Sequence, residues 1–498
     1  MIGRVHCAGD RRNLRARRSG FSIRVVALLA TITPTLLVFL IESPIPRSDR
    51  ALAALLWMLC TIPAWLMIVK PSEQRSPIPF LASIGLAYGW YYALPPTYGA
   101  HNEHWALVVD PRVDYTPALV LAIAGWVMLL LGYRLAGRNW HAPRTATPRF
   151  DLTSKSFPAT VGILCILLGL PLSMLPNVIE LPMTLVGASQ FGSVLWLLGI
   201  SLLVARHAAG VIGFAERLLL VPAVVIALGL ALLSSFIAAL ILVWVTILFT
   251  VWAVRQSLGG LWTMVVIVAA ISGILFKGVI AEFRGIQSQP GEHSLQVSAG
   301  LMEDLVRERV EREGWLGAVM HGQQAAQTRS ANLELFADVI RRTPSEVPYW
   351  NGDTYLSLAG AFIPRVLWPD KPTKELGQAF GHRYSYLLSS DYATSFNLPY
   401  LVEFYANFGA VGVWIGMFLV GMIYRALDYL LNRPGQPIMK SCFGIVLLLP
   451  LLIIESDFSL IFGGLVLNGG ALYLVYKSIE LHSRREHVKR VRPRWTVA

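Results

Sequence analysis

The sequence predicts an all-α membrane protein with about twelve transmembrane helices and one large polar loop over residues 278–401. Three observations support this fold class. Only 14% of the 498 residues are charged, whereas a soluble domain usually carries about 25%. Apolar runs recur along the chain, and about 20 residues of helix cross roughly 30 Å of hydrocarbon. Lys and Arg also gather beside alternate ends of these runs.

A basic tail over residues 1–24 leads into the first apolar run, which has no small-residue cleavage site behind it and is expected to be a retained helix. The expected spans are residues 25–41, 51–69, 78–94, 118–133, 157–175, 191–204, 218–233, 236–254, 261–276, 408–424, 442–454 and 458–476. A break at Ser234-Ser235 is expected because one helix from 218 to 254 would overshoot the bilayer. Nine spans thus fall within 25–277 and three within 402–478, before a second basic tail over 479–498.

The distribution of Lys and Arg predicts that both termini are cytoplasmic. With that orientation the cytoplasmic segments carry 27 Lys and Arg residues, and the short outer turns carry only Arg47, Arg50 and Arg112. The net charge of +12 is then mainly a topology signal, because the large loop has 11 basic and 14 acidic residues. Basic residues spread over many cytoplasmic ends favour contact with membrane lipids, and no nucleic-acid partner is expected.

The four cysteines give no sign of metal or disulfide chemistry. Cys7 lies in the basic tail, and Cys60, Cys165 and Cys442 lie in apolar runs. The large loop has no cysteine that could form a disulfide, and no Cys/His cluster has the spacing of a metal site. The sequence therefore predicts neither a metal nor a cofactor.

The large loop begins with a charged segment, MEDLVRERVEREG over residues 302–314. Its weak apolar stripe and its Glu308–Arg312 pair predict a solvated surface helix. The next segment, 330–342, is an expected amphipathic helix with apolar residues at helical spacing, namely Leu335, Phe336, Val339 and Ile340.

Arg341 and Arg342 close this amphipathic helix. Two interpretations stay open at this point. The cations could complement the helix C-terminus, or they could bind an anionic ligand.

Residues 348–372 read PYWNGDTYLSLAGAFIPRVLWPDKP and are the most distinctive stretch of the chain. Prolines interrupt helix here and fix an irregular backbone, in which Arg365 and Lys371 are embedded. Stiff backbone with embedded cations is typical of a pre-organised anion site. Trp350 and Trp368 are expected in the aromatic belt at the membrane interface, with sugar stacking as the alternative.

The end of the loop carries His382 and Arg383, then Glu403 and Asn407, which are four residues apart and share a helical face. A carboxylate at this depth is costly unless it is solvated, paired or used in chemistry. Glu403 is therefore expected either to pair with a loop arginine or to act as a base at a cavity rim. Farther along, Glu455 and Asp457 are expected to be solvated turn residues.

The sequences IPR at 363–365, WPDKP at 368–372 and EFYANFG at 403–409 resemble the bacterial oligosaccharide repeat-unit polymerases of the Wzy type. The likeness covers about 341–412, and elsewhere only the architecture is similar. It implies a fold like the class C glycosyltransferases, with the active site in 341–401 on the periplasmic side of the inner membrane. It also implies that undecaprenyl-pyrophosphate-linked repeat units are joined into O-antigen or exopolysaccharide, with a chain-length regulator and a flippase as further partners.

The resemblance further implies that loop arginines bind the substrate. The positions that match in kind are Arg341, Arg342 and Arg365, with Lys371, and the additional binding candidates are Arg284, Arg383 and Asn407. Arginine suits this chemistry because its planar donors fit phosphate oxygens and keep their charge. The acceptor hydroxyl also needs a base, for which Glu403 is the first candidate, followed by Asp353 and His382.

Two other functions stay open. An O-antigen ligase would share the loop and its arginines, and differs only in its product. A lipid-linked oligosaccharide flippase also fits many helices, but transport sites usually lie at mid-membrane among charged or broken helices. The expected spans carry almost no charge, so the polymerase is the favoured prediction.

Overall fold

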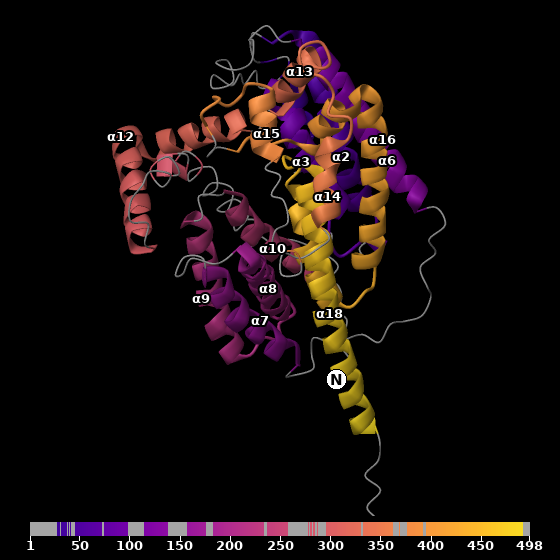
Figure 1. Cartoon of the computed structure of the whole chain (residues 1–498). Coiled ribbons are helices and arrows are strands. Elements are labelled where there is room, and N and C mark those ends of the chain that lie inside the picture. Colours follow the sequence, from indigo (N-terminus) through magenta and orange to yellow (C-terminus); the bar gives the residue numbers. More distant parts are fainter. Residues whose placement is uncertain are drawn as a thin grey trace, which may run out of the picture.

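The computed structural model describes most of the chain between residues 27 and 491. The described residues are 27–40 without 30, 37 and 39, then 45–71, 74–97, 114–137, 157–175, 183–233, 237–256, six positions between 277 and 286, 295–329, 332–361, 368, 376–391 and 395–491. All regular secondary structure within these residues is helical, which confirms the expected all-α class (Figure 1).

Six of the described helices are long and apolar enough to cross a membrane. They are α2 (Arg47–Val69), α6 (Thr116–Ala136), α8 (Met183–Ala208), α9 (Phe214–Leu233), α16 (Tyr400–Leu431) and α18 (Phe458–Val491). Shorter apolar helices are α7 (Phe157–Met174), α10 (Ile237–Arg255) and α17 (Ile438–Leu448), which η4 (Leu449–Leu452) extends. The structure thus has the helices of a polytopic membrane protein, with fewer full-length spans among the described residues than the twelve expected.

The expected spans coincide with helices wherever the structure describes them. Residues 78–94 form α3 (Phe80–Tyr92) and the start of α4 (Leu94–Thr97). The expected break near Ser234 is consistent with α9 ending at Leu233 and α10 beginning at Ile237. The span 25–41 is described only in part, and 261–276 lies outside the described residues.

One group of helices is built on the contact between α6 and α16. A Cβ atom on Gly132 would lie 2.1 Å from the carbonyl oxygen of Phe418, and one on Gly421 would lie 2.0 Å from that of Leu129. The two backbones therefore touch, as small residues allow in membrane helices. Helices α2 and α3 complete the group, and its core includes the fully buried Trp126.

The second group contains α7, α8, α9 and α10, which lie beside the first group in Figure 1. Its helix α9 exposes the apolar side chains Phe214, Leu218, Val221 and Val225 on its outer face, as a lipid-facing helix would. At the opposite end of α9 from Leu233, Arg206 and Glu216 form a buried bidentate ion pair with N–O distances of 2.6 and 3.0 Å. Helices α17 and α18 pack against α7 and α8 and connect the two groups.

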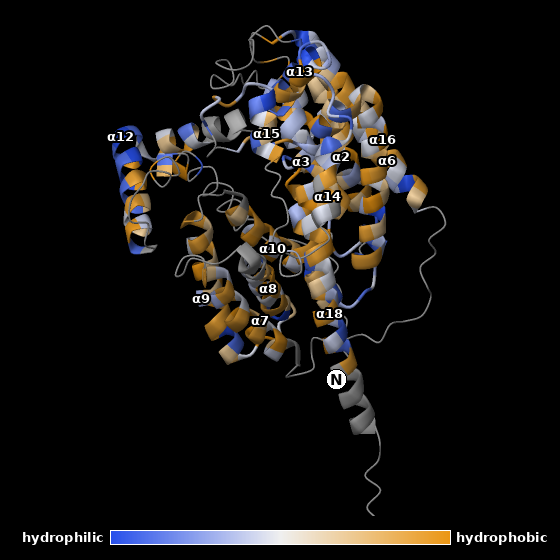
Figure 2. Ribbon diagram, in the orientation of Figure 1, coloured by the Kyte–Doolittle hydropathy of each residue, from blue (hydrophilic) through white to orange (hydrophobic). Residues whose placement is uncertain are grey.

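The first half of the large loop forms α12 (Leu295–Arg329), which extends away from both groups (Figure 1). Gly314 divides this helix into two arms because its φ of +70° is non-helical. The arm before Gly314 carries exposed ion pairs one helical turn apart, Arg307–Glu303 and Arg312–Glu308, and is blue with hydrophilic residues in Figure 2. The expected solvated surface helix is confirmed.

The second half of the loop folds back onto the ends of the first group. It contains α13 (Asn332–Arg342), η3 (Asp353–Tyr355), α14 (Leu356–Ala361) and α15 (Leu376–Arg383). The expected amphipathic helix is confirmed as α13, since Leu335, Phe336 and Val339 are buried. The Phe336 ring lies 6.5 Å from that of Tyr92 in α3 and 5.9 Å from that of Tyr405 in α16. This packing fixes the α13 C-terminus against the helix bundle.

Two expectations need correction. The tenth expected span began at residue 408, but α16 begins at Tyr400 and is interrupted at Phe408 and Gly409. Hydropathy missed the first eight residues because they include Glu403 and Asn407, although the structure buries both. Glu455 was expected to be solvated, yet it is buried. The turn before α18 packs against the start of α16, where the Tyr400 N–H donates to the Ser456 carbonyl.

Candidate functional site

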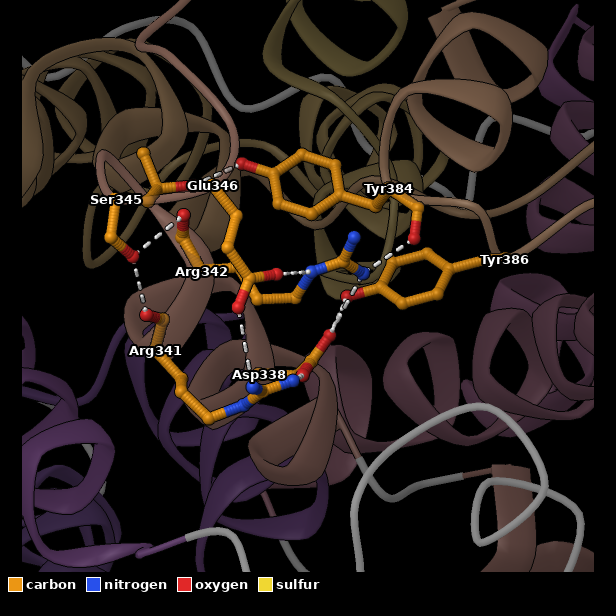
Figure 3. A network of polar contacts seen from close by, with 8 residues as sticks. Asp338, Arg341, Arg342, Ser345, Glu346, Tyr384 and Tyr386 are labelled. Carbon is orange, nitrogen blue, oxygen red and sulfur yellow. Dashed lines mark hydrogen bonds and ion pairs between the residues drawn. The ribbon is translucent and has the colours of Figure 1, made fainter.

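Asp338 organises the polar residues at the C-terminal end of α13 (Figure 3). Its side chain is 0% exposed, and its Oδ1 accepts a hydrogen bond of 2.7 Å from Arg341 Nη2. Its Oδ2 accepts one of 2.7 Å from the Tyr386 hydroxyl and lies 3.6 Å from Arg342 Nη1. Helical spacing explains this arrangement, because residues three and four positions apart share a face. One buried carboxylate therefore anchors both arginines.

A second carboxylate, Glu346, contacts the same arginines from the solvent side. Its Oε2 accepts a 2.9 Å hydrogen bond from Arg342 Nε, and its Oε1 lies 3.6 Å from Arg341 Nη1. The turn that follows α13 brings it there, since the Glu346 N–H donates to the Arg342 carbonyl at 2.7 Å. The two guanidiniums thus lie between a buried and an exposed carboxylate.

Two tyrosines complete the network. The Arg342 guanidinium lies 5.6 Å from the centre of the Tyr384 ring and donates to the Tyr384 carbonyl at 2.5 Å. Burial, and then the Asp338 carboxylate, raise the pKa of the Tyr386 hydroxyl well above its ordinary value. Tyr386 therefore keeps its proton and donates a hydrogen bond to Asp338.

Arg383 brings a third cation to the turn after α13. Its Nη2 donates to the Pro348 carbonyl at 2.7 Å, and its guanidinium lies 4.3 Å from the centre of the Trp350 ring. Trp350 is therefore half-buried against a cation. Arg341, Arg342 and Arg383 outnumber Asp338 and Glu346 by one charge, so this surface is slightly basic within a loop of net negative charge.

Glu403 and Asn407 lie in a second polar group, at the start of α16. Both are 0% exposed. The Asn407 amide accepts from the Gly352 N–H at 2.8 Å and donates to Thr354 Oγ1 at 2.9 Å, as well as to the Glu403 carbonyl at 2.8 Å. Both donors of the Asn407 amide and one acceptor position of its oxygen are therefore occupied, and Asn407 connects η3 to α16.

Glu403 accepts a hydrogen bond from the first turn of α18. Its Oε2 accepts a 2.7 Å hydrogen bond from the Phe458 N–H, which is one of the free donors at a helix N-terminus. Its Oε1 is buried with no hydrogen-bond partner among the described residues. Neither expectation for Glu403 fits this position, because it has no ion pair with a described arginine and no access to solvent.

The three candidate bases therefore differ in access. Glu403 is 0% exposed and contacts the Phe458 N–H. His382 is half-buried on α15, beside Arg383. Asp353 is exposed at the start of η3, where its N–H donates to the Trp350 carbonyl. Asp353 is thus the most exposed of the three side chains.

The two polar groups are connected by the segment 343–352. The Tyr405 hydroxyl approaches the Thr343 carbonyl at 3.5 Å, and the Trp350 N–H donates to the Ala406 carbonyl at 3.0 Å. Of the expected site residues, Arg284, Arg365 and Lys371 lie outside the described residues. Asp338 and Glu346 were missed. Asp338 lies one helical turn before the arginines, so its spacing could have revealed it, whereas Glu346 reaches them through the turn after α13. Nothing in the sequence pointed to Tyr386.

Other features of the described residues lie away from this site. No group of three or more His, Cys, Asp or Glu residues in the described part of the chain could hold a metal ion. A largely apolar cavity of about 260 Å³ lies between α7, α8, α9 and α10, where Ser173, Trp196 and Leu233 line it. It belongs to the second helix group, whereas the arginines lie over the first.

One protein family, described as a domain of unknown function (DUF8712), matches residues 160–432. The match covers more than half of the chain and runs from α7 to the end of α16. It includes Asp338, Arg341, Arg342, Glu346 and Arg383. No curated protein and no solved structure matches the chain. The chain therefore belongs to the family described as domain of unknown function DUF8712.

Proposed function

We propose that this protein is a glycosyltransferase that polymerises undecaprenyl-pyrophosphate-linked repeat units into O-antigen or exopolysaccharide. In this proposal the chain crosses the bacterial inner membrane twelve times in a class C-like fold. Both termini are cytoplasmic, and the loop 278–401 faces the periplasm. The proposal rests on the resemblance over 341–412 and on the chemistry of the arginines there.

The paired arginines at the end of α13 are the observation that carries the proposal. Capping a helix C-terminus needs no buried counter-ion, yet Arg341 and Arg342 are held by Asp338 at 0% exposure. A buried carboxylate is costly, and here it positions two cations on a surface. Arg341 is 44% exposed, and Arg342 Nη2 has no partner among the described residues, so both can reach a ligand. Such a pair suits a diphosphate leaving group.

The proposed reaction forms one bond and breaks one bond. The acceptor sugar oxygen bonds to the anomeric carbon of the growing glycan, and the bond from that carbon to the lipid diphosphate breaks. The arginines stabilise the negative charge that develops on the departing diphosphate. Asp353 is the accessible candidate to accept the proton of the acceptor hydroxyl, since Glu403 is enclosed.

The test compares polysaccharide length in a deletion strain complemented with variants. We expect Arg341→Ala and Arg342→Ala to abolish long polysaccharide and leave single repeats, while the protein still accumulates in the membrane. Arg307→Ala and Arg312→Ala are the matched controls, because these arginines form similar exposed pairs on α12. The proposal fails if both α13 variants make polymer of normal length.

The same strain separates the two alternatives by their products. A ligase would leave long lipid-linked chains after deletion, and a flippase would leave repeat units on the cytoplasmic leaflet. Either result would replace the polymerase, whereas single repeats exposed at the periplasmic face would support it.

A further inference from the structure

Glu346 occupies the place where an anionic ligand of the two arginines would lie. Figure 3 shows its carboxylate between the guanidiniums of Arg341 and Arg342. One oxygen takes the Arg342 Nε hydrogen bond at 2.9 Å, and the other faces Arg341 Nη1 at 3.6 Å. A carboxylate that spans two arginines in this way has the shape of one face of a phosphate group.

The two carboxylates of this network differ in how firmly they are held. Asp338 is 0% exposed, so removing its partners would leave a buried charge without compensation. Glu346 is 53% exposed, and exposed ion pairs contribute little and are weakened by salt. The Glu346 side chain can therefore move from the arginines into solvent at a small cost in free energy. Asp338 stays in place and keeps the arginines oriented.

We propose that Glu346 is a displaceable internal counter-ion, and that a phosphate or diphosphate group replaces it on Arg341 and Arg342. This inference rests on the proposed function for the identity of the natural ligand, but not for the exchange itself. In the exchange the ligand takes the place of Glu346 at Arg341 Nη1 and Arg342 Nε, next to Arg342 Nη2, and no covalent bond changes.

The exchange also gives the site a preference among anions. A ligand carboxylate offers the arginines only what Glu346 already supplies from a tethered position, so it gains little by competing. A diphosphate carries more charge and more acceptor oxygens, so it gains from the exchange. Glu346 thus favours phosphate groups over the carboxylates of acidic sugars.

The test measures binding of inorganic pyrophosphate and acetate to the full chain in phosphatidylcholine nanodiscs by calorimetry at constant ionic strength. We expect pyrophosphate to bind the wild type and acetate to bind at least tenfold more weakly. Glu346→Gln should bind pyrophosphate about threefold to tenfold more tightly, since a weak internal competitor is removed. Arg342→Ala should lose most of this binding.

The matched control is Glu308→Gln, which removes the same charge from an exposed carboxylate that pairs with Arg312 one turn away on α12. Its affinity should equal that of the wild type. Farnesyl diphosphate, a lipid-linked probe, should gain by the same factor as pyrophosphate from Glu346→Gln, because the gain arises at the diphosphate.

The inference is overturned if Glu346→Gln leaves pyrophosphate affinity unchanged or weakens it, if Glu308→Gln tightens binding equally, or if only the lipid-linked probe gains. Failure of the proposed function gives a different result. Pyrophosphate would then bind with the expected order of variants, while the deletion strain would make polysaccharide of normal length.

Discussion

Several polar residues at this site are buried, although their hydropathy does not predict burial. Asp338, Glu403 and Asn407 are all 0% exposed, although each is polar and each lies at the edge of the membrane helices. Their hydrogen bonds offset the cost of removing them from water. Asp338 holds the arginines, while Glu403 and Asn407 fasten α18 and η3 to α16. The positions of the exposed groups therefore depend on the buried ones.

Asn407→Asp tests the hydrogen bonds by which Asn407 connects η3 to α16. The substitution replaces the amide that donates to Thr354 and to the Glu403 carbonyl with an acceptor, so that carbonyl faces a second oxygen. A buried polar group that loses its partner costs about 1–3 kcal/mol, and a charged one costs more. We expect a loss of about 3 kcal/mol, measured as a lower midpoint of thermal unfolding in detergent. Asn351→Asp is the control, because Asn351 is exposed and should tolerate the change.

We expect the stability of the folded protein to depend on pH through the carboxyl group of Asp457. Burial raises the pKa of this carboxyl above its ordinary value near 4, while the Leu460 N–H, donating at 2.9 Å, partly opposes that shift. Because the folded pKa lies above the unfolded one, protonation favours the folded state, and stability from this group increases as the pH falls through the folded pKa. Asp457→Asn is always neutral and removes this contribution. The unfolding midpoint of the wild type should therefore rise relative to Asp457→Asn between about pH 7 and 4; a constant or opposite difference would contradict the assignment.

At the scale of elements, the interruption of α16 separates its membrane part from its polar first turns. Gly409 has a φ of +64° and a ψ of −153°, a region that only glycine occupies readily. A Cβ atom there would lie 2.9 Å from the Tyr349 hydroxyl oxygen. The break therefore allows the segment that carries Tyr349 to pack closely against α16.

Gly409→Ala should disturb this packing in two ways, through backbone strain and through contact with Tyr349. Strain in this region costs about 1–3 kcal/mol, so we expect a lower midpoint of thermal unfolding and faster proteolysis of the large loop. Gly464→Ala in α18 is the control, because a Cβ atom there meets nothing within 4 Å. Equal unfolding midpoints for the two variants would show that the break is not strained.

The elements differ in how well the sequence predicts them. The face of α13 was predictable because Leu335, Phe336 and Val339 follow helical spacing, and so was the charged α12 arm. The start of α16 was not, because Glu403 and Asn407 look like loop residues until their long-range partners are known. Similarly, the arginines were predictable as cations, but Tyr386, which donates to Asp338 from 48 residues away, was not, because its position depends on how α15 packs.

At the scale of the whole molecule, the polar network of Arg341 and Arg342 and the apolar cavity lie at different helix groups. The network lies over the first group, and the cavity lies in the second. The loop's second half covers the ends of the first group, where α13 contacts α3, α6 and α16, and its helix α14 contacts α18. The arginines therefore lie at one end of these helices, and Asp428, which accepts a 2.7 Å hydrogen bond from Asn432, lies near the other end of α16. The proposal that this end faces the periplasm rests on the Lys and Arg distribution alone.

Cysteine labelling tests this orientation. Ser389 is exposed in the loop after α15, and Ser478 is exposed on α18 beyond its expected span. In a Cys7→Ser background, a membrane-impermeant maleimide should label Ser389→Cys in intact spheroplasts. It should label Ser478→Cys only after the membrane is permeabilised. Cys60, Cys165 and Cys442 are buried and should stay unlabelled in both cases. The reverse pattern would place the arginines in the cytoplasm, where periplasmic repeat units could not reach them, and would exclude the polymerase together with the orientation.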